Sequence, residues 1–349
     1  MTTGIERLAA AARGEIADRI PVFCNLFDQG ARELGIPTIQ EYYSRGDLVA
    51  EAQLKMREKY GYDNVWNLFY VGKEAEILGC RKMIYSQHGP PNVGEFIIRS
   101  HEDVHRLQIP ADLSGHPQFT QCAECMKILV SEVGGRQPIT AYLTASMTLP
   151  SILMGMDKWI ELLFTGPAEV RDELLTKCSD FFRTHMTWQM EAGADCLVYA
   201  NPFASTTILP MKMVSDLVFK WMERDLAGFD RNRIVFYCGG APFNNIIQQV
   251  IERLGVFNFY LSPMADISEG RRIVNGRGLT CGVFDDMKLL RFSRDEIRTE
   301  VKRILHEGMP GNRFAFGVQG MPLGITEENI RYMLEAAFEF GAASSEIQP

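Results

Sequence analysis

The feature that most constrains the fold is a repeated alternation of short apolar segments with longer amphipathic stretches. The short segments are apolar nearly throughout, as strands covered on both faces must be, and they span residues 20–25, 64–69, 138–144, 196–201, 233–239, 257–262, 279–284 and 313–319. The stretches between them have the periodicity of crossover helices and span residues 48–60, 167–192, 210–227, 244–254, 267–275, 293–306 and 326–340. Two helix starts are marked by Ser293 with Glu296, a capping box, and by Thr326.

Eight strands that are each followed by a helix predict a (β/α)8 TIM barrel, an α/β fold, as one domain over residues 1–349. An open doubly wound sheet is the alternative, because spacing alone does not give strand order. Residues 71–100 do not fit the repeat and read as an inserted hairpin after the second strand, with strands at 82–85 and 95–98. Residues 118–133 read as an extra helix before the third strand.

Charge and cysteine usage exclude several classes of protein. The 349-residue chain has 44 acidic and 36 basic residues, a net charge of −8, and no run of Lys or Arg longer than a pair. Binding to nucleic acid or to an anionic membrane is therefore not expected. Eight scattered cysteines, no apolar leader and no apolar window long enough to span a bilayer predict a soluble protein of the reducing cytoplasm.

In a barrel, the active site lies at the carboxyl ends of the strands. Polar side chains gather there in this sequence: Asn25, Asp28, Asn67, Tyr142, Thr144, Tyr199, Asn201, Cys238, Ser262, Asp266, Asp285, Asp286 and Gln319. Any one of them reads equally well as a helix cap or a loop hydrogen bond. Their convergence predicts a functional site.

Cys238 ends a strand and precedes two glycines, so it is a candidate nucleophile or metal ligand, or else a buried inert thiol. The pair Cys122 and Cys125 stands alone in a predicted helix and indicates packing. No histidine stands at a strand end, and the sequence contains no dinucleotide-binding, phosphate-binding, zinc-protease or nucleophile-elbow motif. Hydride transfer on a Rossmann fold, phosphoryl transfer and serine-triad hydrolysis therefore lose support.

Several stretches together resemble the uroporphyrinogen decarboxylase superfamily over almost the whole chain: Asp18–Val22, Tyr60–Asp63, Glu74–Cys80, Glu191–Asp195, Asn201–Ser205 and Glu328–Ile330. Within it, the Ala-Glu-x-x-Gly-Cys and Ala-Gly-Ala-Asp stretches are more similar to the corrinoid-dependent methyltransferase branch. The resemblance implies a (β/α)8 barrel. It also implies methyl transfer among small methylated compounds, corrinoid proteins and thiols.

Two departures from the family pattern narrow this expectation. The decarboxylases carry an Arg-Gln-Ala-Gly-Arg signature after the first strand, and residues 25–32 lack it, so porphyrinogen decarboxylation is not expected. The thiol-methylating members bind zinc through His-x-Cys and a later Cys, whereas Phe236, Cys238 and Gln319 occupy those positions here. Phe cannot ligate a metal and an amide suits a thiolate site poorly, so Cys238 is a doubtful metal ligand.

The resulting hypothesis is a methyltransferase that moves a methyl group between a small methylated compound, such as a methoxylated arene, and a corrinoid held by a partner protein. Tyr142, Tyr199 and Asp285 are the acid–base candidates. Asn25, Asn201 and Gln319 would orient the substrate, against an apolar wall of Phe27, Phe69 and Phe236.

Two alternatives stay open at this stage. The protein is either a zinc-dependent methylcobamide:thiol methyltransferase that recruits His88, Glu76 or Asp285 beside Cys238, or a non-catalytic barrel that binds a cobamide or another small ligand. Glu74 and Glu76 lie in a family-like stretch, although both read equally as solvated loop residues.

Overall fold

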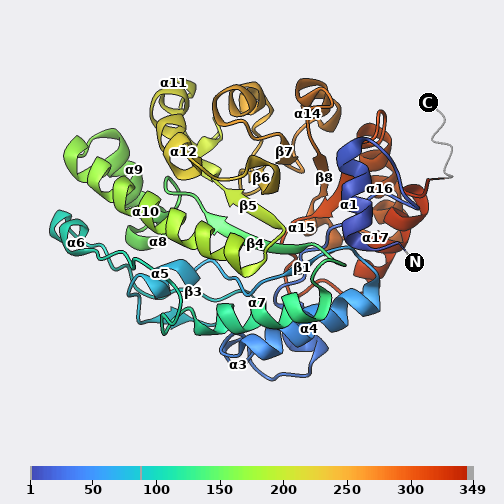
Figure 1. Cartoon of the computed structure of the whole chain (residues 1–349), viewed down its shortest axis with the longest axis horizontal. Helices are drawn as coiled ribbons and strands as arrows, with labels where there is room; N and C mark the ends of the chain where they lie inside the picture. Colours follow the sequence, from blue (N-terminus) through green and yellow to red (C-terminus); the bar gives the residue numbers. More distant parts are fainter. Residues whose placement is uncertain (1, 87–88, 344–349) are drawn as a thin grey trace.

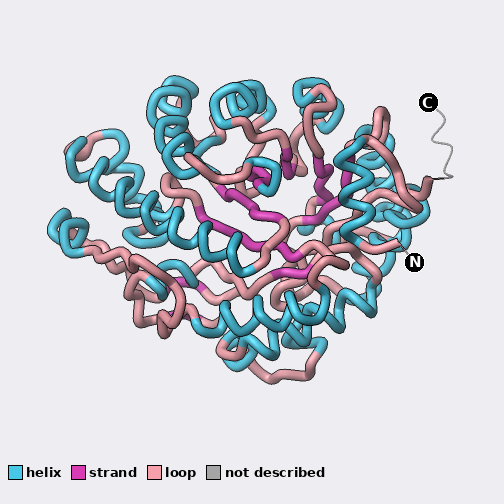
Figure 2. The backbone as a smooth tube through the Cα atoms, viewed as in Figure 1, coloured by secondary structure: helices cyan, strands magenta, loops and turns pink. Residues whose placement is uncertain are grey.

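The computed structural model describes residues 2–86 and 89–343. Within them, seven parallel strands form one sheet in the order β1-β4-β5-β6-β7-β8-β9. The strands are β1 Val65–Trp66, β4 Ile139–Thr144, β5 Cys196–Ala200, β6 Ile234–Tyr237, β7 Asn258–Tyr260, β8 Thr280–Phe284 and β9 Phe314–Val318. The sheet is curled, with the strands gathered in the centre and helices outside them (Figures 1 and 2).

Each of the predicted helical stretches contains helix, and further helices that were not predicted, such as those at Gly4–Arg13, Leu149–Met154 and Met156–Phe164, lie outside them. The helices are α1 Gly4–Arg13, α2 Gln29–Glu33, α3 Ile39–Tyr43, α4 Gly46–Tyr60, α5 Lys73–Ile77, α6 His101–Arg106, α7 Thr120–Val133, α8 Leu149–Met154, α9 Met156–Phe164, α10 Ala168–Ala192, α11 Met211–Met213, α12 Phe219–Leu226, α13 Ile247–Gln249, α14 Ile267–Val274, α15 Asp286–Leu289, α16 Arg294–Gly308 and α17 Glu327–Phe340. Short 3-10 turns lie at Pro202–Ala204, Arg231–Arg233 and Asn244–Ile246, and π-helical turns at Val214–Val218 and Val250–Leu254. The capping box at Ser293 and the cap at Thr326 are confirmed, and α7 is helical where residues 118–133 were predicted to be.

The segment 20–25, predicted as the first strand, makes an isolated parallel bridge from Val22 to Phe316 of β9. On its other side, the Val22 carbonyl accepts from the Asp63 amide at 2.8 Å. A longer ladder does not form because Pro21 has no N–H and because the Cys24 amide donates to the Asn64 side chain at 2.9 Å. The segment nevertheless lies between β9 and the residues that lead into β1.

The predicted hairpin is correct in its first strand and wrong in its second. The antiparallel strands are β2 Met83–Ile84 and β3 Asn92–Val93, so the second strand lies before residues 95–98. The physical reason is that the Ile98 amide donates to the Leu153 carbonyl at the end of α8, at 3.0 Å. The backbone there is bound to a helix end and is not available to a β-ladder.

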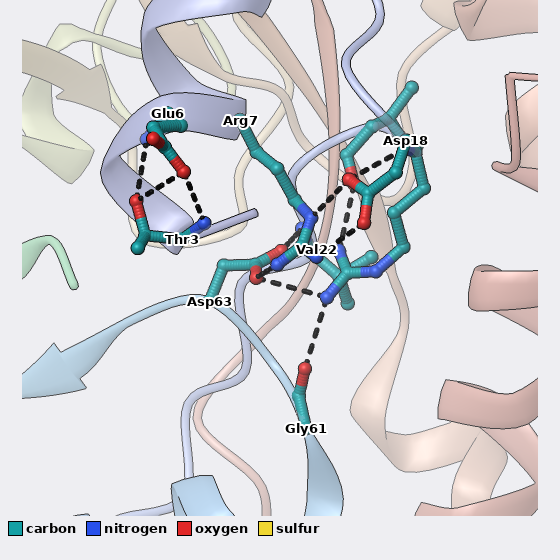
Figure 3. Close-up of polar contacts among 9 residues, drawn as sticks. Thr3, Glu6, Arg7, Asp18, Val22, Gly61 and Asp63 are labelled. Atoms are coloured by element: carbon teal, nitrogen blue, oxygen red, sulfur yellow. Dashed lines mark hydrogen bonds and ion pairs between the residues drawn. The ribbon is translucent and has the colours of Figure 1, made fainter. Parts of the chain in front are cut away.

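A buried carboxylate fixes the N-terminal segment to the sheet (Figure 3). Asp63, which precedes β1, is fully buried and pairs with Arg7 of α1 at 2.8 Å and with Arg19. It also accepts a hydrogen bond from the Val22 amide at 2.8 Å. Arg7 makes a second ion pair with the half-exposed Asp18, at 2.6 Å. Asp63 thus joins α1, the 20–25 segment and the start of β1.

The apolar core forms two layers, which decides which side chains face the site. Ile234 and Phe236 of β6 belong to the large cluster between strands and helices. Val235 and Tyr237, at the alternate positions, pack in a smaller cluster with Tyr260 on the inner side of the sheet. The inner layer therefore consists of every second residue of each strand.

Candidate functional site

A cavity of about 340 Å³ lies on the inner side of the curled sheet. One end is formed by residues near the strand starts, among them Thr140, Cys196 and Leu279. The other end is formed by loop residues that follow strands, among them Val71, Pro90 and Met321. The cavity therefore reaches the carboxyl ends of the strands, where sites are built in this class of fold, and its volume suits a small organic molecule.

Aromatic rings make a large part of the cavity wall. Phe69 and Tyr142 stack with their centroids 4.1 Å apart and an interplanar angle of 30°. Phe27 meets Phe69 edge-on at 6.1 Å, and Tyr142 meets Tyr237 edge-on at 6.5 Å. The structure thus brings together the predicted cavity residues Phe27, Phe69 and Tyr142. Such a wall favours flat apolar ligands.

Polar groups in the cavity are few. Asn25, predicted to orient a substrate, donates weakly from Nδ2 to the Tyr260 hydroxyl at 3.4 Å. Its buried Oδ1 has no hydrogen-bond partner within the described residues. The Tyr260 hydroxyl donates to the Val318 carbonyl at 2.5 Å. The free Asn25 oxygen is therefore available to a donor on a ligand.

Burial shifts the ionisable groups of the lining toward their neutral forms. Burial raises the pKa of Asp28, whose Oδ1 accepts from the Tyr43 hydroxyl at 2.8 Å. Burial also raises the pKa of Tyr142 and Tyr260 well above the ordinary value, and that of Tyr237 to about 12. Among the described residues that line the cavity there is no Lys, Arg or His. The described lining therefore offers no positive charge to a ligand.

Several predicted site residues lie elsewhere. Tyr199 faces the helices and donates to the buried Asp225 carboxylate at 2.8 Å, and Phe236 packs in the same outer layer. Both occupy the outward-facing positions of their strands. The sequence pattern does not distinguish outward from inward positions, because both carry apolar residues. The structure therefore places Tyr199 and Phe236 outside the described lining of the cavity.

Three further predicted site residues do not line the cavity and make hydrogen bonds to other residues of the protein. Asn201 is fully buried and its Oδ1 accepts from Thr148 at 3.1 Å. Asp285 caps α15 by accepting from the Met287 amide at 3.0 Å. Gln319 does not line the cavity itself, but its amide donates to the hydroxyl of the cavity residue Tyr237 at 3.1 Å.

A buried polar network supports the Phe69–Tyr142 pair from behind. Glu74, predicted as a site or surface residue, is 2% exposed and accepts from the Thr144 amide at 3.0 Å. Its carboxylate lies 3.3 Å from Nδ1 of His185, whose other ring nitrogen contacts Gln189 at 3.0 Å. The network lines a space of about 10 Å³, the size of one water, which Phe69 and Tyr142 also border.

Zinc does not fit the residues present. Cys238 is fully buried in the outer layer, and burial raises the pKa of its thiol well above the ordinary value, which opposes the thiolate that binds a metal. Glu76 is held by the Tyr70 hydroxyl at 2.6 Å and by Lys73 at 2.8 Å, and His88 lies outside the described residues. Within the described ranges, no three His, Cys, Asp or Glu side chains converge as metal ligands.

Comparison with known proteins places the chain in a family. The family model for uroporphyrinogen decarboxylase (URO-D) matches residues 3–340. The chain belongs to the URO-D family. This confirms the resemblance found in the sequence. For this URO-D family member, every helix in the described ranges is too short or too polar to span a bilayer.

The relatives of this URO-D family protein are methyltransferases by name. It is 24% identical to the methylcobamide:CoM methyltransferase MtbA of Methanosarcina acetivorans over 95% of this chain and 96% of the relative. It is 23% identical to the methylcobamide:CoM methyltransferase MtaA of Methanosarcina barkeri over 96% of this chain and 98% of the relative. A solved methyltransferase from Methanosarcina mazei has the same fold, with a TM-score of 0.84, 21% identity and coverage of 98% of this chain and 100% of that one.

Sequence reasoning missed several cavity residues. Phe23, Trp66, Tyr70, Tyr237 and Tyr260 all line the cavity, and none of them was predicted as a site residue. When both faces of a strand are apolar, the sequence does not show which alternate residues face the inner layer and which face the outer layer. Asp28 stood among the strand-end polar residues without an assigned role.

Proposed function

We propose that the protein transfers a methyl group between a small, neutral, largely apolar methylated compound and a corrinoid held by a partner protein. The observation that carries the proposal is the aromatic cavity, which has no cationic side chain in its described lining. The relatives support the reaction class, because their names describe methyl transfer between a methylcobamide and CoM.

The lining determines which ligand is favoured. A charged ligand loses its hydration on entering such a cavity, and an anion would find no cation among the described lining residues. A methoxylated arene loses little hydration and gains contact with Phe27, Phe69 and Tyr142. Asn25 would orient it by donating from Nδ2, which bonds Tyr260 only weakly at 3.4 Å, to the ether oxygen. The partner's reduced corrinoid supplies the nucleophile that accepts the methyl group.

The proposal also includes the closure of the sheet into a barrel. We propose that the chain is a single (β/α)8 barrel domain in which residues 20–25 take the place of the first strand, since Val22 contacts both β9 and the residue before β1. The segment 71–100 would then be an insertion that contributes Val71, Gly89 and Pro90 to the cavity. The free cysteines fit a cytoplasmic location.

Paired substrates test the proposal. We expect 4-methoxytoluene to be demethylated by the protein and a reduced corrinoid protein, and 4-methoxybenzoate to react more slowly by on the order of 10-fold or more, because its carboxylate is unpaired in the cavity. The two compounds differ in charge at a position remote from the reacting methyl group. A preference for the anionic compound, or no demethylation of any neutral compound, contradicts the proposal.

A variant of Tyr199 tests whether this tyrosine of the outer layer contributes to stability and not to catalysis. We expect Tyr199→Phe to lower the free energy of unfolding by about 1–3 kcal/mol, because the buried Asp225 loses one of its donors. Turnover should stay close to that of the wild type, since Tyr199 does not line the cavity. Urea unfolding and initial rates measure the two effects. A large loss of turnover in a stably folded variant would return Tyr199 to the site.

A further inference from the structure

Asp28 is the one carboxyl group among the described residues that line the cavity. It lies in the loop between the 20–25 segment and α2 and is 3% exposed. Oδ1 accepts from the Tyr43 hydroxyl of α3, and within the described residues Oδ2 takes part in no hydrogen bond or ion pair. Because no protein group there uses Oδ2, it is available to a ligand in the cavity.

The surroundings of Asp28 contain no compensating positive charge in the described ranges. Arg32, on the same helix, is committed to the carbonyls of Leu323 and Ile325 at 3.2 and 3.1 Å. The other titratable groups that line the cavity are tyrosines and thiols: Tyr43, Tyr70, Tyr142, Tyr237, Tyr260, Cys196 and Cys281. Burial raises the pKa of Asp28, while the Tyr43 hydrogen bond lowers it. The carboxyl is thus kept protonated to higher pH than an exposed aspartate.

We propose that Asp28 is the general acid that protonates the departing oxygen of the methyl donor. This assignment rests on the proposed function. In the step, the C–O bond of the ether breaks and both of its electrons stay on oxygen, which takes the proton of the Asp28 carboxyl. The methyl carbon forms its new bond with an electron pair from the reduced corrinoid. The products are a phenol and an Asp28 carboxylate, which regains a proton from water.

The chemistry of the neighbouring groups favours Asp28 over them. Burial raises the pKa of Tyr43, Tyr142 and Tyr260 well above that of an ordinary phenol. They therefore hold their protons more tightly than a phenolate product does, and they are poor donors to it. The Asn25 amide cannot donate a proton at all. A carboxyl group is the stronger acid, and Asp28 supplies it within the cavity.

The test is a leaving-group series with Asp28→Asn, which keeps the size of the side chain and an acceptor for Tyr43. For 4-methoxytoluene we expect kcat to fall by about 100-fold or more, the range of general acid catalysis. For 4-nitroanisole the fall should be much smaller, because nitrophenolate is a good leaving group whose departure does not depend on a proton. The rate of the variant should thus depend more steeply on the pKa of the leaving phenol.

Tyr43→Phe is the matched second variant, because it keeps the carboxyl and removes its hydrogen-bond donor. A general acid works in its protonated form, so activity falls as pH rises through its pKa. Without the Tyr43 hydroxyl that pKa rises, and the alkaline limb of the pH–rate profile should move to higher pH. An unchanged limb contradicts the proposal even where Asp28→Asn folds poorly.

A binding titration that needs no corrinoid uses 4-nitrophenol, which is yellow only when ionised. Wild-type protein should bind the anion with loss of colour as the Asp28 proton is donated, and Asp28→Asn should not. Equal leaving-group slopes, or a change confined to KM, would assign Asp28 to binding and overturn the proposal. A wild type that demethylates no ether would refute the proposed function itself, and this inference with it.

Discussion

Replacing Asp63 with alanine is expected to lower the free energy of unfolding by about 3–5 kcal/mol, the effect of removing one partner from a buried ion pair. The substitution leaves the guanidinium groups of Arg7 and Arg19, which are 10% and 12% exposed, without their shared carboxylate. It also leaves the Val22 amide without its acceptor. Equilibrium urea unfolding followed by circular dichroism measures the loss.

Asp18→Ala is the matched control for Asp63. Asp18 pairs with the same Arg7 at 2.6 Å, but its side chain is 49% exposed. Exposed ion pairs contribute about 0–1 kcal/mol, so the control should unfold nearly as the wild type does. Equal losses in the two variants would show that the buried position of Asp63 (Figure 3) is not what stabilises the N-terminal segment.

Filling the cavity should reduce activity far more than stability. Val198 of β5 lines the cavity, so Val198→Phe places a ring in the space meant for substrate. Overpacking of about 1–3 kcal/mol against the bound substrate corresponds to a loss of about 5- to 150-fold in kcat/KM. The empty cavity accommodates the ring, so the melting temperature should change little. Initial rates with 4-methoxytoluene and thermal unfolding give the two quantities.

Val198→Ala is the control for the filled cavity, because it enlarges the same space. Its kcat/KM should stay within several-fold of the wild-type value, since the aromatic wall is unchanged. Were the phenylalanine variant to demethylate 4-methoxytoluene as fast as the wild type, the substrate would have to bind elsewhere.

The sequence predicts the order of strands and helices well because each element carries its own local pattern. The capping box at Ser293 and the helix at 120–133 are examples. The 20–25 segment is harder, because its pairing depends on Pro21 and on the Asn64 side chain, a contact across 40 residues. Local periodicity does not contain such long-range information.

The site was predicted only in part, for a reason that lies in the geometry of buried strands. Asn25, Phe27, Phe69 and Tyr142, which were all predicted as site residues, lie together in the lining of the cavity. Tyr199 does not, although it also lies near a strand end, because it takes the outward position and binds Asp225. Inward and outward positions carry the same apolar residues when both faces of a sheet are covered, and only the assembled fold separates them.

Transfer of an isotopic label tests the central claim most directly. The protein is mixed with a reduced corrinoid protein and 4-methoxytoluene carrying a ¹³C-methyl group, and the products are analysed by mass spectrometry. The account predicts that the label moves to the corrinoid and that unlabelled 4-methylphenol forms in equal amount. Label that stays on this and every other neutral donor, while an anionic thiol accepts methyl groups from the methylated corrinoid, would contradict it.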